Sequence, residues 1–347
     1  EAKTVRARID GSYMTGDVDL VFNSGNVAYF LISHDGNAVA GISENINIEV
    51  YDINDNKVNL FEGIIDVYTN SAEEIDMITW GIGDGAGTII EESGDTLRYQ
   101  FSASDGGDVT LNITDNRAET IRLYSSMGGV TSLSASQLVV GHGTADRIFV
   151  ISGDGQRAVV NTAVPLPLAV GVEDQWGNRV AGQTVTFSVI AGGGSIDTDS
   201  STGGIQTTDI TGAQGIASCD TWIMGTTSGY LSDRARAAIP SGSVVSTDFR
   251  ATTDHDDLNT VVLSPASSFV TVNSFTIITA TLRDQFGNLV TGENLTVFIK
   301  DTPEGSLGPD ASNPNPTISL GPAIRSGTSD STGTITLVYN APGSAGI

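Results

Sequence analysis

Residues 168–191 read LAVGVEDQWGNRVAGQTVTFSVIA, and this stretch indicates β-structure. Apolar residues alternate with small or polar residues on both sides of a turn that begins at Asp174. An alternation of period two is typical of a β-strand that buries one of its faces. The stretch therefore predicts a β-hairpin with one buried face.

The same pattern occurs twice more in the chain. Residues 46–70 read INIEVYDINDNKVNLFEGIIDVYTN, and residues 277–300 read IITATLRDQFGNLVTGENLTVFIK. The turn aspartates Asp52, Asp174 and Asp284 are spaced by roughly 110 to 120 residues, which is the size of a small domain. The sequence therefore predicts tandem repeats rather than one large core.

The composition of these turns has a physical explanation. An aspartate at the first position can accept hydrogen bonds from backbone N–H groups two and three residues further on. Gly177 and Gly287 can take the left-handed conformation, and Asp55 can take it at the equivalent position of the first repeat. We therefore interpret the motif as structural.

Residues 174–182 (DQWGNRVAG) and 284–292 (DQFGNLVTG), with the later Thr-Asp-x-x-Gly of residues 208–212, carry a family resemblance. They resemble the group 1 bacterial immunoglobulin-like repeat, which builds the stalks of intimin- and invasin-type surface adhesins. The resemblance covers residues 145–347, whereas the first repeat departs from it because Asp55 replaces the turn glycine. It implies immunoglobulin-like β-sandwiches and a role at the cell surface.

The fold class that we predict is all-β, with three tandem immunoglobulin-like β-sandwich domains joined into a rod. Residues 27–140 form the first and divergent domain, residues 145–250 the second, and residues 258–347 a third domain that lacks its last strand. Residues 1–26 are expected to be a closing strand and a linker that belong to a preceding or neighbouring unit.

Charge and composition exclude several classes of protein. The 347 residues carry a formal net charge of −25 and have a sequence pI near 4.1, so the chain would repel the phosphates of nucleic acid. The apolar stretches fall far short of the roughly 18 residues that a membrane span needs. A strongly negative surface favours solubility outside a cell. We expect an extracellular, cell-surface protein that has no nucleic-acid partner and no membrane span in this chain.

The two ends of the sequence predict how copies assemble. The first strand resembles the strands that close the first domain after Glu119 and the second after Leu231, while residues 258–347 stop short of a closing strand. We expect this strand of one copy to complete the third domain of the next, head to tail. Its residues are Thr4, Val5, Arg6, Ala7, Arg8 and Ile9. The alternative is that the chain is one three-domain period of a longer covalent protein.

Three apolar residues occupy turn positions that are normally polar. They are Ile53, Trp176 and Phe286, and we expect them to pack at the joints between domains. Trp176 is predicted to lie near residues 104–108 or 141–144, and Phe286 near residues 209–212 or 254–257.

Candidate ligands for a metal or a reaction are few. Asp254, Asp256 and Asp257 fall in a predicted linker and could bind calcium, although a solvated charge run explains them equally simply. No other cofactor is expected. The one cysteine, Cys219, and three scattered histidines form no catalytic or zinc pattern, so we do not expect an enzyme.

The function that the sequence predicts is mechanical. We expect a non-catalytic structural component of an extracellular fibre, either a filament subunit or an adhesin stalk, whose partners are other copies of itself. The alternative is an adhesin module that binds a glycan or receptor on a host or neighbouring cell, with Trp80 as its candidate aromatic residue. A surface hydrolase is the least favoured alternative, because it needs two carboxylates held across a cleft.

Overall fold

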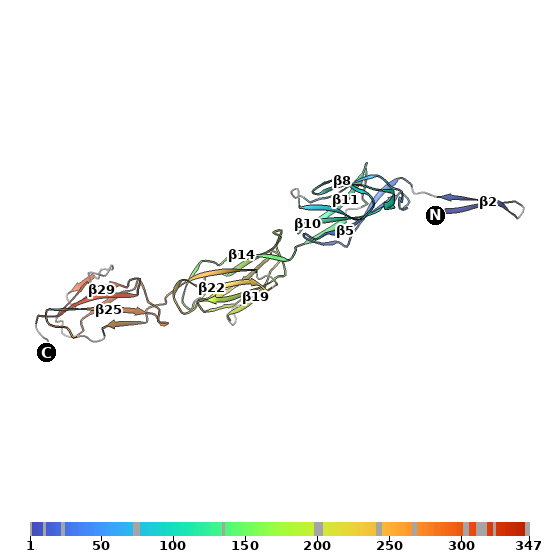
Figure 1. The fold of residues 1–347 in the computed structure, drawn as a ribbon. Coiled ribbons are helices and arrows are strands. Elements are labelled where there is room, and N and C mark those ends of the chain that lie inside the picture. The colour runs from blue at the N-terminus through green and yellow to red at the C-terminus, as the bar shows by residue number, and fades with distance from the viewer. Residues whose placement is uncertain are drawn as a thin grey trace. The chain divides into compact units, whose positions relative to one another are not determined.

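The computed structural model describes residues 2–9, 12–21, 25–71, 77–133, 136–197, 204–240, 245–265, 269–300, 305–309, 318–321 and 324–343. Over these residues the chain is built of β-strands, and the one helix is the single 3-10 turn η1 (Ala103–Asp105) (Figure 1). No helix in these ranges is long and apolar enough to cross a membrane. The predicted all-β class, with sheets that repeat along the chain, is confirmed.

The chain divides into two compact units. The first contains Glu1–Arg147 and Glu173–Ala181, and the second contains Ile148–Val172 and Gly182–Ile347. The strands after residue 26 fall into three sets, which the described β-ladders do not join to one another. The exact domain boundaries given above remain a prediction.

The first set of strands is a complete immunoglobulin-like sandwich. One sheet has the order β3 (Val27–Ser33), β5 (Glu44–Asp52), β10 (Asp108–Asp115) and β7 (Ile78–Asp84). The other has the order β4 (Asn37–Val39), β13 (Ser136–Gly141), β11 (Thr120–Met127), β6 (Ile64–Thr69), β9 (Thr96–Gln100) and β8 (Thr88–Ser93), and β12 (Val130–Thr131) pairs with β11. Both sheets contribute fully buried side chains to one core, among them Ile48, Leu111, Val67 and Ile121.

The second set repeats this arrangement. One sheet has the order β14 (Ala145–Ser152), β16 (Leu168–Asp174) and β20 (Ile216–Cys219), and β18 (Ser195–Asp197) pairs with β21 (Thr221–Ile223). The opposite sheet has the order β15 (Gln156–Val159), β23 (Val245–Asp254), β22 (Gly229–Ile239), β17 (Thr184–Ala191) and β19 (Gln206–Ile210). As in the first set, the short edge strand β15 runs parallel to its neighbour, β23.

The third set has fewer described strands. One sheet has the order β24 (Thr260–Ser264), β25 (Phe275–Arg283), β30 (Thr334–Asn340) and β27 (Ser306–Pro309). The other has the order β26 (Asn294–Phe298), β29 (Ile324–Thr328) and β28 (Ile318–Gly321). No described strand takes the places that β22 and β23 fill in the second set, and the buried core comprises Ala280, Leu282, Val290, Ile335 and Leu337.

The strands on either side of each turn aspartate lie in different sheets, so the prediction of a hairpin was wrong. β5 and β6 belong to opposite sheets, as do β16 and β17, and β25 and β26. Each turn therefore connects the two layers of a sandwich. The alternation of apolar residues shows that each strand buries one face, but it is the same whether two strands pair edge to edge or face each other across a core.

The N-terminal segment contains two strands where the sequence predicted one strand and a linker. β1 (Ala2–Ile9) and β2 (Ser12–Val21) pair with each other in antiparallel register, with Arg6 opposite Asp17. Among the described strands, neither pairs with any other. We call this element the N-terminal hairpin.

Candidate functional site

Each repeat contains a five-residue turn that we call the joint turn, namely Asp52–Asn56, Asp174–Asn178 and Asp284–Asn288. The three joint turns share one hydrogen-bond pattern. Oδ1 of Asp174 accepts from the backbone N–H groups of Trp176 and Asn178, both at 2.9 Å. Gly177, three residues after Asp174, instead donates to the Asp174 carbonyl at 3.1 Å and has a φ of 87°. The side chain thus binds residues two and four further on, rather than two and three as predicted. The equivalent turns are Asp52–Asn56 and Asp284–Asn288, with φ of 60° at Asp55 and 89° at Gly287.

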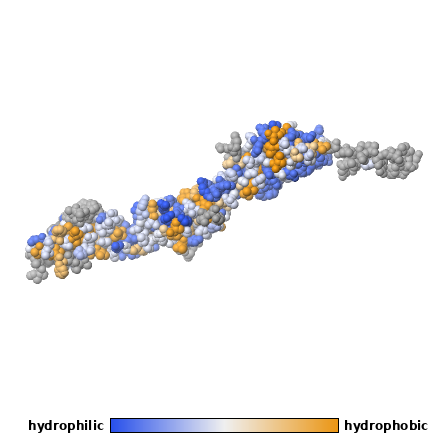
Figure 2. Space-filling view, in the orientation of Figure 1, coloured by the Kyte–Doolittle hydropathy of each residue, from blue (hydrophilic) through white to orange (hydrophobic). Residues whose placement is uncertain are grey.

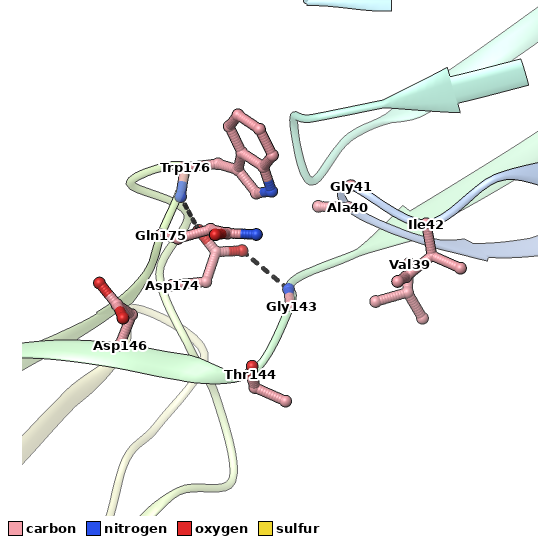
Figure 3. A pocket seen from close by; sticks show the side chains of 10 residues that line it. All are labelled: Val39, Ala40, Gly41, Ile42, Gly143, Thr144, Asp146, Asp174, Gln175 and Trp176. Atoms are coloured by element: carbon pink, nitrogen blue, oxygen red, sulfur yellow. Dashed lines mark hydrogen bonds between the residues drawn. The ribbon is translucent and has the colours of Figure 1, made fainter. Parts of the chain in front are cut away.

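The second oxygen of each turn aspartate holds the linker that precedes its own set of strands. Oδ2 of Asp174 accepts from the N–H of Gly143 at 2.8 Å (Figure 3). Oδ2 of Asp52 accepts from Gly25 at 2.8 Å, and Oδ2 of Asp284 accepts from the Asp256 N–H at 3.0 Å. The aspartate therefore fixes the start of the first strand of each set, which sequence spacing did not predict.

These bonds favour the ionised carboxylate. The N–H groups of Gly25 and Asn56 hold the pKa of Asp52 at about 2. Burial alone would raise the pKa of Asp174, but hydrogen bonds from the Asn178 amide and from backbone N–H groups outweigh it and hold that pKa below its usual value. The pKa of Asp284 is lowered in the same way. The three turns are therefore charged at neutral pH.

The last residue of the turn, an asparagine, reaches a loop of the preceding set of strands, which lies between β10 and β11 in the first set and between β21 and β22 in the second. Within the first unit, Nδ2 of Asn178 donates to the carbonyl of Asn116, and its Oδ1 accepts from the N–H of Ala118, both at 2.9 Å. Within the second unit, Asn288 binds the carbonyl of Thr226 and the N–H of Ser228 in the same way, again at 2.9 Å.

Asn56 occupies the same position in the first turn and is exposed. Its amide donates to Asp52 at 3.1 and 3.3 Å. The turn motif by itself does not predict these contacts. The recurrence of asparagine at the same position of all three repeats was the signal that could have indicated a shared role.

The apolar turn residues differ in exposure. Trp176 is 42% exposed and lines a pocket with Val39, Gly41, Gly143 and Thr144 (Figure 3). Its indole lies so close to Gly41 that a side chain there would clash with it. Phe286 is 37% exposed and Ile53 is 81% exposed. The structure thus places Trp176 beside the linker of residues 141–144, while the packing role of all three residues stays a proposal.

Two of the three aspartates predicted to bind calcium, Asp254 and Asp256, have protein partners in the structure. Asp254 is bound by the guanidinium group of Arg157, with N···O distances of 2.5 and 2.6 Å. Asp256 accepts from Nε2 of Gln285 at 2.6 Å. Nowhere in the described ranges do three or more His, Cys, Asp or Glu side chains stand close enough together to hold a metal ion. Neighbouring polar side chains thus bind Asp254 and Asp256, and a calcium role of the three aspartates stays a prediction.

Other candidate residues also lie in unreactive surroundings. Trp80 is buried in the first core and its indole N–H donates to the Gly94 carbonyl at 2.9 Å, so it is not an exposed binding residue as the alternative required. Cys219 is buried, and burial raises the pKa of its thiol to about 11. The carboxylates Glu73, Glu74 and Asp76 lie outside the described residues.

One buried carboxyl group lies directly before the loop that Asn178 binds. Oδ1 of Asp115 accepts from the Arg117 N–H at 2.8 Å, but its buried Oδ2 has no hydrogen-bond partner. Burial raises the pKa of Asp115 to about 6. This group is therefore partly protonated in mildly acidic solution.

The predicted inter-subunit strand coincides with β1. Thr4 is exposed, and the side chains of Val5, Arg6, Ala7, Arg8 and Ile9 lie outside the described part of the structure. The backbone of this strand pairs with β2 and not with residues 27–140 of its own chain.

A scan against models of protein families found no match to this sequence, and neither did a comparison with curated proteins. Among solved structures, the Escherichia coli adhesin FdeC is 16% identical, with a TM-score of 0.43 over 94% of this chain and 92% of that one. InvD of Yersinia pseudotuberculosis is 14% identical, with a TM-score of 0.41 over 90% of this chain and 82% of that one.

Invasin, a bacterial integrin-binding protein, is 12% identical, with a TM-score of 0.35 over 91% of this chain and 55% of invasin. The chain thus spans about half of invasin's length. Over most of its length, the chain is structurally similar to immunoglobulin-like adhesins of the intimin and invasin type.

Proposed function

We propose that this chain is a non-catalytic structural component of an extracellular fibre at a cell surface, either a filament subunit or an adhesin stalk. In this fibre, the N-terminal hairpin of one copy completes the third set of strands of another. The observation that supports the proposal is an open position in the third set, at the place where the second set holds the hairpin β22–β23.

The first edge of this open position is β26. Its counterpart β17 lies between β19 and β22, and Val185 and Phe187 on β17 are fully buried. Counted from the turn aspartate, the equivalent residues of β26 are Leu295 and Val297. Both are only partly buried, and among the described strands β26 pairs with β29 alone.

The second edge is the segment before β25. In the second set, β15 pairs with β23, and the N–H of Val160 then donates to the Asp254 carbonyl at 2.8 Å. Val160 is 1% exposed, whereas its counterpart Val272 is 44% exposed. Asn161 and Asn273, which follow these valines, share a left-handed conformation with φ of 58° and 55°. Phe269 nearby is fully exposed, and Figure 2 shows apolar surface on this set of strands at the left of the view.

A hairpin that enters this position would bury apolar surface and pair an open strand edge. Each fully buried Val, Leu or Phe contributes about 1.5 to 3 kcal/mol, and an exposed apolar edge otherwise favours aggregation. The N-terminal hairpin is of the required kind, because like β22–β23 it is antiparallel and sets an arginine opposite an aspartate, Arg6 with Asp17 and Arg236 with Asp248. Contacts of this kind are heterologous and do not close, so they build a fibre.

The experiment compares the full chain with a variant that lacks residues 1–24. We expect the full chain to form end-to-end oligomers in sedimentation velocity and filaments in electron micrographs, and the shortened variant to stay monomeric. A synthetic peptide of residues 1–24 should bind the shortened variant and raise its unfolding temperature. A full chain that stays monomeric at high concentration, together with a peptide that does not bind, would disprove the proposal.

A pair of point variants tests the edge itself. Val297→Asp places a charge where the hairpin should pack, and it should reduce assembly by at least tenfold. Thr296→Asp alters the adjacent and exposed residue of the same strand, and it should assemble like the unmodified chain. Equal assembly by both variants would contradict a docking site at β26.

A further inference from the structure

We propose that the exposed joint turn Asp52–Asn56 binds the loop that follows β30 in another copy, and so forms a third joint built like the other two. The inference rests on the proposed function, since the partner is the copy whose third set receives the N-terminal hairpin. It adds a second and separate contact, which no strand pairing requires.

Three backbone hydrogen bonds establish which residues of the loops are equivalent. The N–H of Gly41 donates to the Asp115 carbonyl at 2.8 Å, that of Asn161 to the Gly225 carbonyl at 3.0 Å, and that of Asn273 to the Pro342 carbonyl at 3.2 Å. The three donors share a left-handed conformation, with φ of 75°, 58° and 55°. The loops at Asp115, Gly225 and Pro342 are therefore equivalent.

This equivalence identifies the loop carbonyl group to which each joint-turn asparagine donates. Asn178 donates to the residue directly after Asp115, which is Asn116, and Asn288 donates to the residue directly after Gly225, which is Thr226. In the third set, the residue directly after Pro342 is Gly343. The carbonyl of Gly343 is therefore the acceptor that Asn56 of a second copy would reach.

The joint turn Asp52–Asn56 already has the geometry of the two joint turns that bind a loop. Oδ2 of Asp52 holds the Gly25 N–H at 2.8 Å, just as its counterparts hold their own linkers. Asp55 accepts from the Tyr29 hydroxyl at 2.8 Å, and the ring of Tyr29 stacks on Tyr51 with centroids 5.4 Å apart. These contacts fix the turn before a partner arrives, so binding it costs little conformational entropy.

The exposure of the turn residues distinguishes this joint from the other two. Ile53 is 81% exposed, whereas Trp176 is 42% and Phe286 is 37% exposed at the equivalent position. Asn56 is exposed, whereas Asn178 and Asn288 are half-buried. A second copy that contacts the turn through Gly343 would cover both residues, as the equivalent loops do elsewhere.

A cross-linking experiment with the full chain tests this contact. Asn56→Cys and Gly343→Cys are introduced together, and the assembled protein is treated with a short bismaleimide. Gly343 accepts a side chain, because an added Cβ would lie 3.1 Å from Oδ1 of Asn273, the end of a side chain that can shift. The native Cys219 is buried, so the unmodified chain serves as the background control.

Two matched pairs calibrate the result. Asn116→Cys with Asn178→Cys reports the same contact inside one chain and should link intramolecularly. Ser93→Cys with Gly343→Cys moves the first cysteine to an exposed site at the end of β8 that lies opposite the turn, and should give no ladder. We expect the Asn56 and Gly343 pair to give a ladder of covalent multimers on a denaturing gel.

Failure of the inference and failure of the proposed function look different. If the double variant forms filaments but no ladder, while the Asn116 and Asn178 pair links, the third joint is wrong and the fibre stands. If no variant assembles, both fail. Asn56→Ala should also weaken end-to-end association by about tenfold, whereas Asn54→Ala in the same turn should leave it unchanged. Equal affinity for the two variants would overturn the inference.

Discussion

At the residue scale, the aspartate of the joint turn connects three segments that are distant in the sequence. Asp174 binds its own turn and the linker at Gly143, which lies 31 residues earlier in the sequence. It also binds the amide of Asn178, and Asn178 in turn binds Asn116, 62 residues before Asn178. Sequence predicted the aspartate and the left-handed Gly177, because turn chemistry is local. It could not predict the longer bonds, because nothing in the pattern shows which backbone groups come near.

Asp174→Asn should destabilise the joint turn Asp174–Asn178 and its contact with the Gly143 linker. The substitution replaces Oδ2 by an NH₂ group that faces two donors, the Gly143 N–H and the Asn178 amide, so we expect the free energy of unfolding to fall by about 1 to 3 kcal/mol at pH 7. The pKa of Asp174 is lowered on folding, so its contribution is present above the usual aspartate pKa and is lost as the pH falls through the folded value. The difference between the two proteins should therefore shrink below about pH 4 in urea unfolding. Asp146→Asn, an exposed neighbour, is the control, and equal effects of the two changes would contradict the role of Asp174.

Asp115 should make the protein less stable at neutral pH than in mild acid. Its pKa is raised to about 6 in the folded chain, above the usual 3.8, so folding favours the protonated form. Stability from this group is fully present below about pH 4 and is lost as the pH rises through about 6. Asp115→Asn should thus raise the free energy of unfolding by about 2 kcal/mol at pH 7.5, and the gain should disappear near pH 4. A gain that does not change with pH would rule out titration of Asp115 as its cause.

At the element scale, alternation of apolar residues predicted most strands but not how they pair. The turns at Asp52, Asp174 and Asp284 join opposite sheets, and a strand with one buried face has the same sequence pattern in a hairpin or across a core. The second strand of the N-terminal hairpin, β2, occupies residues that the sequence assigned to a linker. Trp80 was misread as exposed for a related reason, since pattern alone does not show which face of β7 is covered.

Hydrogen exchange should reveal the open edge of β26. In the variant that lacks residues 1–24, backbone amides of β26 should exchange much faster than those of its counterpart β17, which is paired on both sides. In the assembled full chain the two strands should be protected to a similar degree. Fast exchange of β26 in filaments would show that the hairpin docks elsewhere.

At the scale of the whole molecule, repetition made the broad architecture predictable. Three copies of one turn motif predicted three sets of strands, and three such sets are present among the described strands. That the third set lacks its closing strand stays a prediction. Composition could not show which charges are paired in the folded chain, as Asp254 is with Arg157. The hydrogen bonds of the joint-turn asparagines could not be predicted from the sequence, because they depend on contacts between loops of different repeats.

The size of the native subunit separates a filament from a stalk. A filament of separate chains should dissolve, on boiling in detergent, into a single band near 36.0 kDa. A stalk in which this sequence is one period of a longer chain should give a much larger band, although the contacts at β26 and Asn56 would be the same. Mass spectrometry of the intact denatured protein is the check. A ladder of multimers that survives boiling would instead indicate covalent links between copies.

The open position in the third set has a consequence for how such a fibre grows. In the proposed fibre every copy would bring one hairpin and one open position, so the fibre would present a free hairpin at one tip and an unfilled slot at the other. The two tips would differ chemically, and the growing fibre would be polar. A small protein that carries only a matching hairpin would fill the slot and offer none in return, so it would act as a terminator and set the fibre's length.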